Sequence, residues 1–362
     1  MQKFRLIFIL LIMTGCMHAP YSHDQMVDQR NDLLPTKEKI KLLAGSGSQL
    51  DEGRLASLAK LYAQDSDLDN AIVSISKAIK LAPLNAAYHD QLARYASLAG
   101  KNLLARTESA IADDLGFSDL NHQILELQLA LDDGDTTKFL RMMGSMVNDV
   151  TPVPMLNYLY GVSYLMGKDT LEAIHRFKEC IQKEPDMDKA SLALSRIYAG
   201  EDSIELALNE VNRMLSRKPK LLNFILLKAE LMEQMDATEE AINLYMQHWT
   251  LSHRAESLVK VKQIYWNRNE YDSVLKYSRI EAAIVSREKD GLLSEARALD
   301  KLRQYQASLK IYTKLYELDT LDSKVGKERT MLERKIAYLQ RKKEEEKKLA
   351  DSLIKTLPAL KF

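Results

Sequence analysis

One position in this sequence recurs at an almost constant spacing from the first third of the chain to its last third. Small or apolar residues occupy it, and the step from one to the next is constant except at one place, where it is shorter by a single residue: Ala71, Ala105, Phe139, Ala173, Ala207, Ala241, Val274 and Ser308. A constant period of about 34 residues is typical of stacked supersecondary units, each of which buries one face against the next. We therefore expect one array of eight units, beginning near residues 52, 86, 120, 154, 188, 222, 255 and 289, instead of several compact domains.

The composition favours helices and balances the charge. Of the 362 residues, 46% are hydrophobic and 28% are charged, and helix breakers are few, with 13 Gly and 8 Pro. Lys and Arg together number 51, as do Asp and Glu. No overall field therefore draws the chain to nucleic acid, and we expect no nucleic-acid partner.

Each unit contains two apolar-periodic segments, with small residues where the two segments meet. The fourth unit shows this best, and the first and fifth repeat it; in the fourth the residues are Tyr160, Gly161, Tyr164, Ala173, Phe177, Cys180 and Pro185. The pattern resembles the tetratricopeptide repeat, in which small residues let two antiparallel helices approach closely. The resemblance implies an all-α fold, a right-handed α-solenoid of about eight helical hairpins. The third unit carries Leu127 and Phe139 at its small positions, so we expect its helices to pack irregularly.

The first residues have the layout of a signal peptide, with two basic residues before an apolar run from Leu6 to Met13. Residues 13–16, Met-Thr-Gly-Cys, resemble a bacterial lipobox, which implies cleavage after residue 15 and lipidation of Cys16. Several acyl chains anchor a protein stably, whereas this apolar run is too short to span a bilayer. We predict a lipoprotein signal peptide over residues 1–15 and a lipidated N-terminus and tether over residues 16–50. Ordinary secretion with a chance cysteine is the alternative.

A charged segment follows the repeats, which we expect to occupy residues 51–322. Residues 323–362 favour helix but lack the hairpin pattern, and between Lys324 and Lys348 ten Lys and Arg against five Glu leave a net charge of +5. The last unit of a solenoid needs a polar outer face, so we predict a charged capping helix. Contact of this basic tract with lipid headgroups or with an acidic partner is the alternative.

No pattern of catalytic or ligand-binding residues stands out. The sequence contains no GxGxxG, no GxxxxGK[ST], no HExxH, no GxSxG and no CxxC. His248 and His253 lie on different faces of a helix, and Cys180 falls at a buried position of the repeat. The acidic turn from Asp132 to Asp135 lacks the final glutamate of a calcium-binding loop. We therefore predict no enzyme activity, no cofactor, no metal site and no small-molecule substrate.

The resemblance also predicts where partners bind. Tetratricopeptide proteins generally hold a peptide or a helix on the concave surface lined by the first helices of successive units. By the repeat positions, the partner-binding groove is made of Met155, Tyr158, Val162, Leu165, Met166, Leu192, Arg196, Leu226, Glu230 and Trp266. Much of this set is apolar, as in protein contacts, and Arg196 and Trp266 are candidate hot spots. The alternative is that some of these side chains pack against neighbouring helices or the chain's own tail.

Together these features suggest one functional hypothesis. We expect a lipid-anchored scaffold or adaptor in a bacterial cell-envelope assembly, such as outer-membrane biogenesis, secretion or cell-wall machinery, located on the outer membrane and facing the periplasm. Its partners would be other proteins, bound through the groove, and the membrane, reached through the N-terminal lipid. A self-assembling periplasmic structural protein, whose groove is filled by a second copy, is the competing hypothesis.

Overall fold

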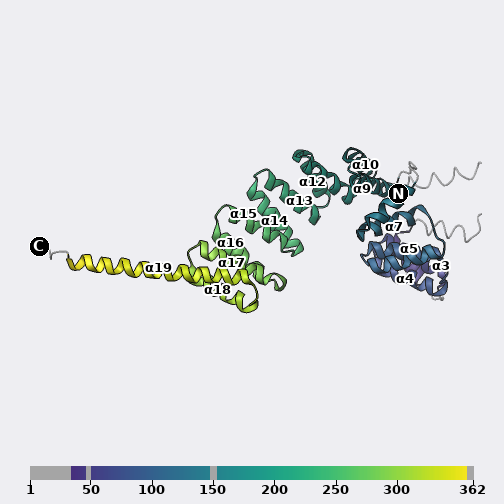
Figure 1. Ribbon diagram of the computed structural model, residues 1–362. Helices are drawn as coiled ribbons and strands as arrows, with labels where there is room; N and C mark the ends of the chain where they lie inside the picture. The colour runs from purple at the N-terminus through teal and green to yellow at the C-terminus, as the bar shows by residue number, and fades with distance from the viewer. Residues whose placement is uncertain (1–33, 46–49, 147–152, 357–362) are drawn as a thin grey trace, which may run out of the picture. The chain divides into compact units, whose positions relative to one another are not determined.

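The computed structural model of the protein describes residues 34–45, 50–146 and 153–356, and within these ranges it contains helices and no strand (Figure 1). Sixteen of the helices follow one another as eight hairpins, whose first helices begin within one residue of the predicted starts. The pairs are α3 (Glu52–Gln64) with α4 (Leu68–Leu81), α5 (Ala86–Leu98) with α6 (Asn102–Asp114), α7 (Leu120–Asp132) with α8 (Thr136–Ser145), α9 (Pro154–Met166) with α10 (Thr170–Lys183), α11 (Asp188–Gly200) with α12 (Ile204–Arg217), α13 (Leu222–Gln234) with α14 (Thr238–Ser252), α15 (Glu256–Asn267) with α16 (Tyr271–Ala282), and α17 (Glu288–Lys301) with α18 (Tyr305–Leu318).

The turn inside each hairpin has the same backbone conformation in all eight units. One turn residue is left-handed, with φ between 56° and 71°: Ser66, Gly100, Gly134, Lys168, Asp202, Asp236, Asn269 and Arg303. The N–H of the next residue then bonds to the carbonyl five residues earlier, as from Lys101 to Ala96 at 2.8 Å. This is the bond that closes a helix C-terminus in a Schellman motif. The turn residues recur with the period of the small-residue positions, including its one shortened step.

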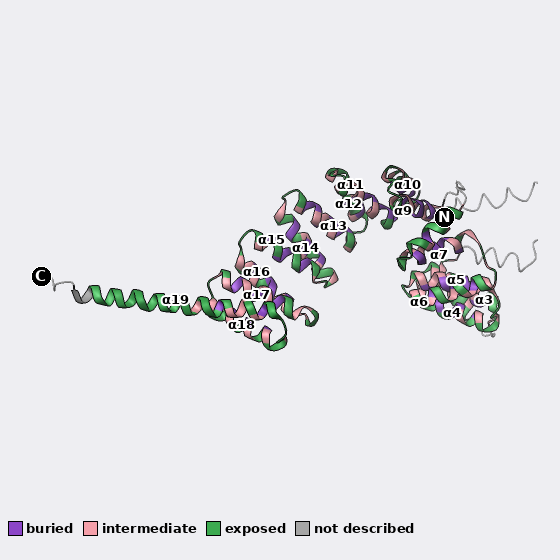
Figure 2. Ribbon diagram, in the orientation of Figure 1, coloured by how far each residue is buried: buried purple, intermediate pink, exposed green. Residues whose placement is uncertain are grey.

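The recurring small position is buried inside the hairpins. Its alanines at 71, 105, 173, 207 and 241 are fully buried, and so are Phe139 and Ser308. In the fourth hairpin the Phe177 ring lies against Gly161, where an added Cβ would come within 2.6 Å of the ring. In the eighth, the Ser308 hydroxyl donates to the Ala296 carbonyl at 2.7 Å. Figure 2 shows the buried residues, in purple, alternating with exposed ones along these helices. The predicted all-α array of helical hairpins is confirmed.

The third hairpin departs from its neighbours. Its second helix, α8, has 10 residues, whereas the second helices of the other hairpins have 12 to 15. Leu127 and Phe139, which stand where most other hairpins have smaller residues, are both fully buried. The chain also divides soon after this hairpin into two compact units, residues 1–159 and residues 160–362.

The one shortened step of the repeat lies between the sixth and seventh hairpins. α14 ends at Ser252, and His253, which replaces the proline that ends other units, is left-handed with φ of 53°. His248 is buried, and its Nδ1 lies 2.7 Å from Ser257 Oγ on α15. Burial lowers the pKa of His248 below its usual 6.5; the charge of Glu256 opposes this shift and that of Arg254 adds to it. The His248 imidazole between the sixth and seventh hairpins is therefore uncharged at neutral pH.

Two further helices flank the hairpins. α2 (Thr36–Ala44) falls within the predicted tether and buries none of its residues. α19 (Ser323–Thr356) follows α18, and its first part packs on the last hairpin through the buried Val325 and Leu332. All residues from 337 to 353 are exposed, and Figure 1 shows this half of α19 running on past the hairpin. The charged helix therefore covers the last hairpin with its first half only.

The predicted signal peptide and Cys16 lie outside the residues that the structure describes. Among the helices that it does describe, none is both long and apolar enough to cross a membrane.

The closest approach of two helix backbones at a glycine occurs in the second unit, and it predicts a stability effect. An added Cβ at Gly291 on α17 would lie 2.3 Å from the backbone N of Ala282 on α16. We expect Gly291→Ala to lower the free energy of unfolding by about 1–3 kcal/mol, because the two helices must move apart. Urea denaturation followed by circular dichroism measures the change.

Gly200 supplies the matched control, since it also lies in a helix but has no atom within 4 Å of its added Cβ. Gly200→Ala should leave stability unchanged or raise it by up to about 1 kcal/mol, because alanine favours helix over glycine. Equal midpoints for the two variants would contradict the close approach at Gly291.

The buried His248 predicts a pH dependence of stability. Its pKa is lowered on folding, so its contribution is fully present above its unfolded value of 6.5 and is lost as pH falls through the folded value. We expect acidification from about pH 7.5 to about pH 5.5 to destabilise the wild type more than His248→Gln, which has no imidazole to protonate. Urea midpoints of both proteins at both pH values measure the difference, and parallel pH profiles would rule out the effect.

Candidate functional site

None of the ten predicted groove residues is buried, since eight are half-buried and Met166 and Arg196 are exposed. Met155 belongs to the first unit, as does Tyr158, and the other eight belong to the second. Several also pack internally: Gln128 donates a hydrogen bond to Met155 Sδ at 3.2 Å, and Leu192 packs against the core of the fifth and sixth hairpins. Part of their surface is thus used inside the chain, and partner binding at these positions stays a prediction.

Two adjacent hollows in the second unit lie along α15. One, of about 350 Å³, is lined by Val259, Lys262, Gln263, Trp266, Val274, Ser294 and Arg297. The other, of about 470 Å³, is lined by Leu226, Glu230, Ala255, Glu256, Val259, Lys260 and Arg287. Val259 lines both, so the hollows form one groove over α13, α15 and α17, which we call the α15 groove. Three predicted residues line it, namely Leu226, Glu230 and Trp266, and the other seven lie outside these two hollows.

Charged groups in the floor of the α15 groove are paired with one another. Lys262 is 8% exposed, its ammonium group contacts the carboxylate of Glu281 on α16, and it donates to Ser294 Oγ at 3.0 Å. Glu281 is fully buried and also accepts a hydrogen bond from Arg287 Nη2 at 2.9 Å. Removing one member of such a buried pair costs about 3–5 kcal/mol, because the other charge is left unpaired. Each of these buried charges therefore depends on its partner.

The edge of the groove is tied to the C-terminal helix. Arg297 donates to Glu328 on α19 at 2.6 Å, and the Tyr312 hydroxyl donates to the same carboxylate at 2.8 Å. Burial, with the hydrogen bond to Glu328, raises the pKa of Tyr312 above its usual 10, so the phenol remains a donor. The lining also includes apolar side chains, and the largest of them, Trp266, rests edge-on against Tyr271 at 5.3 Å between ring centroids.

Two groove residues that were not predicted could have been identified from the repeat period. Val259 and Gln263 occupy the positions of Leu226 and Glu230 one unit later, across the shortened step of the repeat. Periodicity alone would have found them. Lys262 carried no such signal, because its place depends on Glu281, which lies on the next helix.

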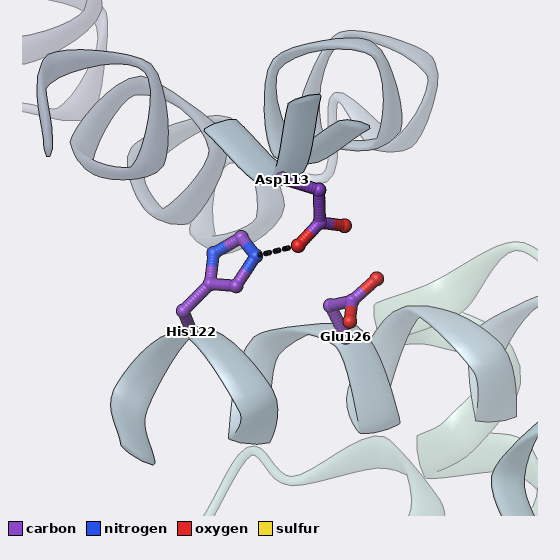
Figure 3. A group of neighbouring side chains, drawn as sticks. All are labelled: Asp113, His122 and Glu126. Carbon is purple, nitrogen blue, oxygen red and sulfur yellow. Dashed lines mark hydrogen bonds and ion pairs between the residues drawn. The ribbon is translucent and has the colours of Figure 1, made fainter. Parts of the chain in front are cut away.

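A second group of polar side chains, in the first unit, was not predicted at all. His122 on α7 is 1% exposed; its Nδ1 lies 2.9 Å from Asp90 Oδ1 and its Nε2 lies 2.9 Å from Asp113 Oδ1. Glu126, one turn further along α7, points into the same space as Asp113 (Figure 3). The hydrogen bond to Asp90, helped by Asp113, raises the pKa of His122 to about 9. No sequence pattern marks this group, because its members come from three different helices.

No protein-family model matches the chain, and no curated protein matches it. Several solved structures are similar to it. Human IFIT1, crystallised as a dimer with PPP-AAAA, is similar over 78% of this chain and 67% of that one, with 15% identity and a TM-score of 0.50. A tetratricopeptide repeat protein from Parabacteroides merdae matches over 78% and 98%, with 14% identity and a TM-score of 0.44. PilF from Pseudomonas aeruginosa matches over 57% and 94%, with 15% identity and a TM-score of 0.45.

At these identities, similarity to solved structures concerns the fold alone. The constant period, the repeated left-handed turn and the buried small positions are features of the chain itself, and they agree with that fold. The described part of the chain has the fold of a tetratricopeptide-type array of eight helical hairpins.

Proposed function

We propose that this protein is a lipid-anchored scaffold or adaptor of a bacterial cell envelope, which binds a segment of another protein in the α15 groove. One observation carries the proposal: residues expected from the repeat to face a partner, Leu226, Glu230 and Trp266, line two adjoining hollows of about 470 and 350 Å³. Concave sites lined by apolar side chains with a few polar groups are the usual form of a binding site.

The chemistry of the groove favours a peptide or helix that inserts apolar side chains. The buried charges of the floor, those of Lys262 and Glu281, are paired with each other. Charged side chains of both signs, Glu230 and Lys260 among them, line the rest of the groove. Leu226, Val259 and Trp266 supply apolar contact area, and a partly exposed tryptophan is a typical anchor of a protein interface.

The anchor in this proposal is the lipid on Cys16, with residues 17–50 as the tether. Support comes from the order of basic residues, apolar run, small residues and cysteine at the N-terminus. The location that we propose is the outer membrane, with the hairpins facing the periplasm. A self-assembling structural protein is the second candidate, and the groove experiment below separates the two.

The groove proposal predicts site-specific crosslinking. A photocrosslinking residue at position 259 or 263 should capture one partner protein in cells, whereas the same residue at position 206, which is exposed on α12 outside the groove, should not. With the captured partner purified, Trp266→Ala should raise the Kd by about 30-fold, the ~2 kcal/mol expected of a hot spot, and Leu206→Ala should leave it unchanged.

Crosslinks from position 259 to a second copy of the chain would favour the self-assembling structural protein over the adaptor. Equal capture from positions 206 and 259, or a Kd that Trp266→Ala leaves unchanged, would contradict binding in the groove.

The anchor is tested separately. We expect Cys16→Ser to abolish incorporation of labelled fatty acid and to release the protein from the membrane fraction, because the remaining apolar run is too short to span the bilayer. Cys180→Ala, which changes a buried cysteine, serves as the matched variant and should keep its label. Membrane fractionation that is the same for Cys16→Ser and wild type would refute lipid anchoring.

A further inference from the structure

The group around His122 in the first unit brings three potential metal ligands together. One ligand atom from each of Asp113, His122 and Glu126 lies within 4.8 Å of the others. His122 and Glu126 are four residues apart on α7 and therefore share a face of the helix, while Asp113 comes from the last turn of α6. Figure 3 shows the Asp113 carboxylate reaching toward the imidazole, with the Glu126 carboxylate beside it.

We infer that Asp113, His122 and Glu126 form a binding site for one divalent transition-metal ion of the zinc class. The ligands would be Nε2 of His122 and one carboxylate oxygen from each acid, with water completing the coordination. Imidazole nitrogen and carboxylate oxygen are ordinary zinc ligands, at about 2.0–2.2 Å from the metal. In a tetrahedral site of that size, ligand atoms lie about 3.3 Å apart, so small rotations of the two acidic side chains would suffice.

The surroundings of His122 fit this role. Asp90, which is fully buried, accepts a hydrogen bond from Nδ1 of His122, and this leaves Nε2 directed at Asp113. Metal-bound histidines almost always donate their other ring N–H to a carboxylate or carbonyl in this manner. Asp90 is itself paired with the guanidinium group of Arg94.

His89, the other buried histidine of this unit, shows what a purely structural arrangement looks like. Its Nδ1 lies 2.6 Å from Glu108 Oε2 and its Nε2 lies 3.0 Å from the Pro83 carbonyl oxygen. One carboxylate faces this ring, and a backbone carbonyl oxygen lies within hydrogen-bond distance of its second nitrogen. At His122, carboxylates face both nitrogens and a third stands beside Nε2.

Charge and access also favour an ion at this place. Asp113 and Glu126 bring two carboxylates to one point, and Lys138 Nζ lies 3.2 Å from Glu126 Oε1. A divalent ion would take the place of the proton on Nε2 and would compete with Lys138 for Glu126. The Asp113 side chain is 43% exposed, so an ion can enter from solvent.

The test uses the full chain, purified in detergent and stripped of metal with a chelator. Calorimetric titration with Zn²⁺ and absorption spectra with Co²⁺, both at about pH 8, should give one bound ion per chain. His122→Gln and Asp113→Asn should each weaken binding by at least about 10–100-fold, and His89→Gln, the matched control, should leave it unchanged. Lys138→Met should tighten binding several-fold, because it removes the cation that competes for Glu126.

Melting curves without metal show whether each variant is folded. If His122→Gln unfolds, Asp113→Asn still tests the site, because it changes a half-exposed side chain. Zn²⁺ should also raise the melting temperature of the wild type but not that of Asp113→Asn. Failure of the wild type to bind either ion, or equal binding by wild type and Asp113→Asn, would overturn the site.

Discussion

The close approach of two helices inside each hairpin is the constraint on which the rest of the structure depends. It is favoured by a small residue at one position of the second helix and by a turn tight enough to bring the chain straight back. Alanine occupies the first position in five hairpins, although the third buries Phe139 there, and a left-handed turn residue is present in all eight. Only two of these eight turn residues are glycine. At the other six turn positions a left-handed side chain costs about 1–2 kcal/mol each. The hydrogen bond from the N–H of the following residue, which closes the helix, outweighs that cost.

Regular hairpins place the same helical face of each unit on the same surface, which is why a groove can form from first helices that are far apart in sequence. Buried charged side chains lie next to the α15 groove on this surface. Lys262, Glu281 and Arg287 form a network that holds α15, α16 and the start of α17 together. Glu281 is shared by both cations, so these charges are engaged within the chain. Trp266 and Val259 supply apolar surface beside them.

Sequence reasoning predicted the groove only in part. Leu226, Glu230 and Trp266 were found because a repeat position predicts which face of a helix a residue occupies. Leu192 occupies the position of Leu226 one unit earlier but gives part of its surface to internal contacts, and Met155 does so too. A repeat position does not say how far a neighbouring helix covers a side chain, since this depends on the size of the residues around it. The cluster at His122 was missed for a related reason: its members come from three helices, and none of them belongs to a motif.

The sequence by itself determined the number of hairpins, their starting points and the buried small positions, because each depends on interactions within a single repeat unit and its neighbour. Tertiary structure decided which side chains pair across helices, where hollows remain, and how far α19 covers the last hairpin. It also brought Asp90, Asp113 and Glu126 around His122. Periodicity describes local burial, whereas a site depends on distances between side chains that are remote in the chain. Those distances exist only once the helices have packed.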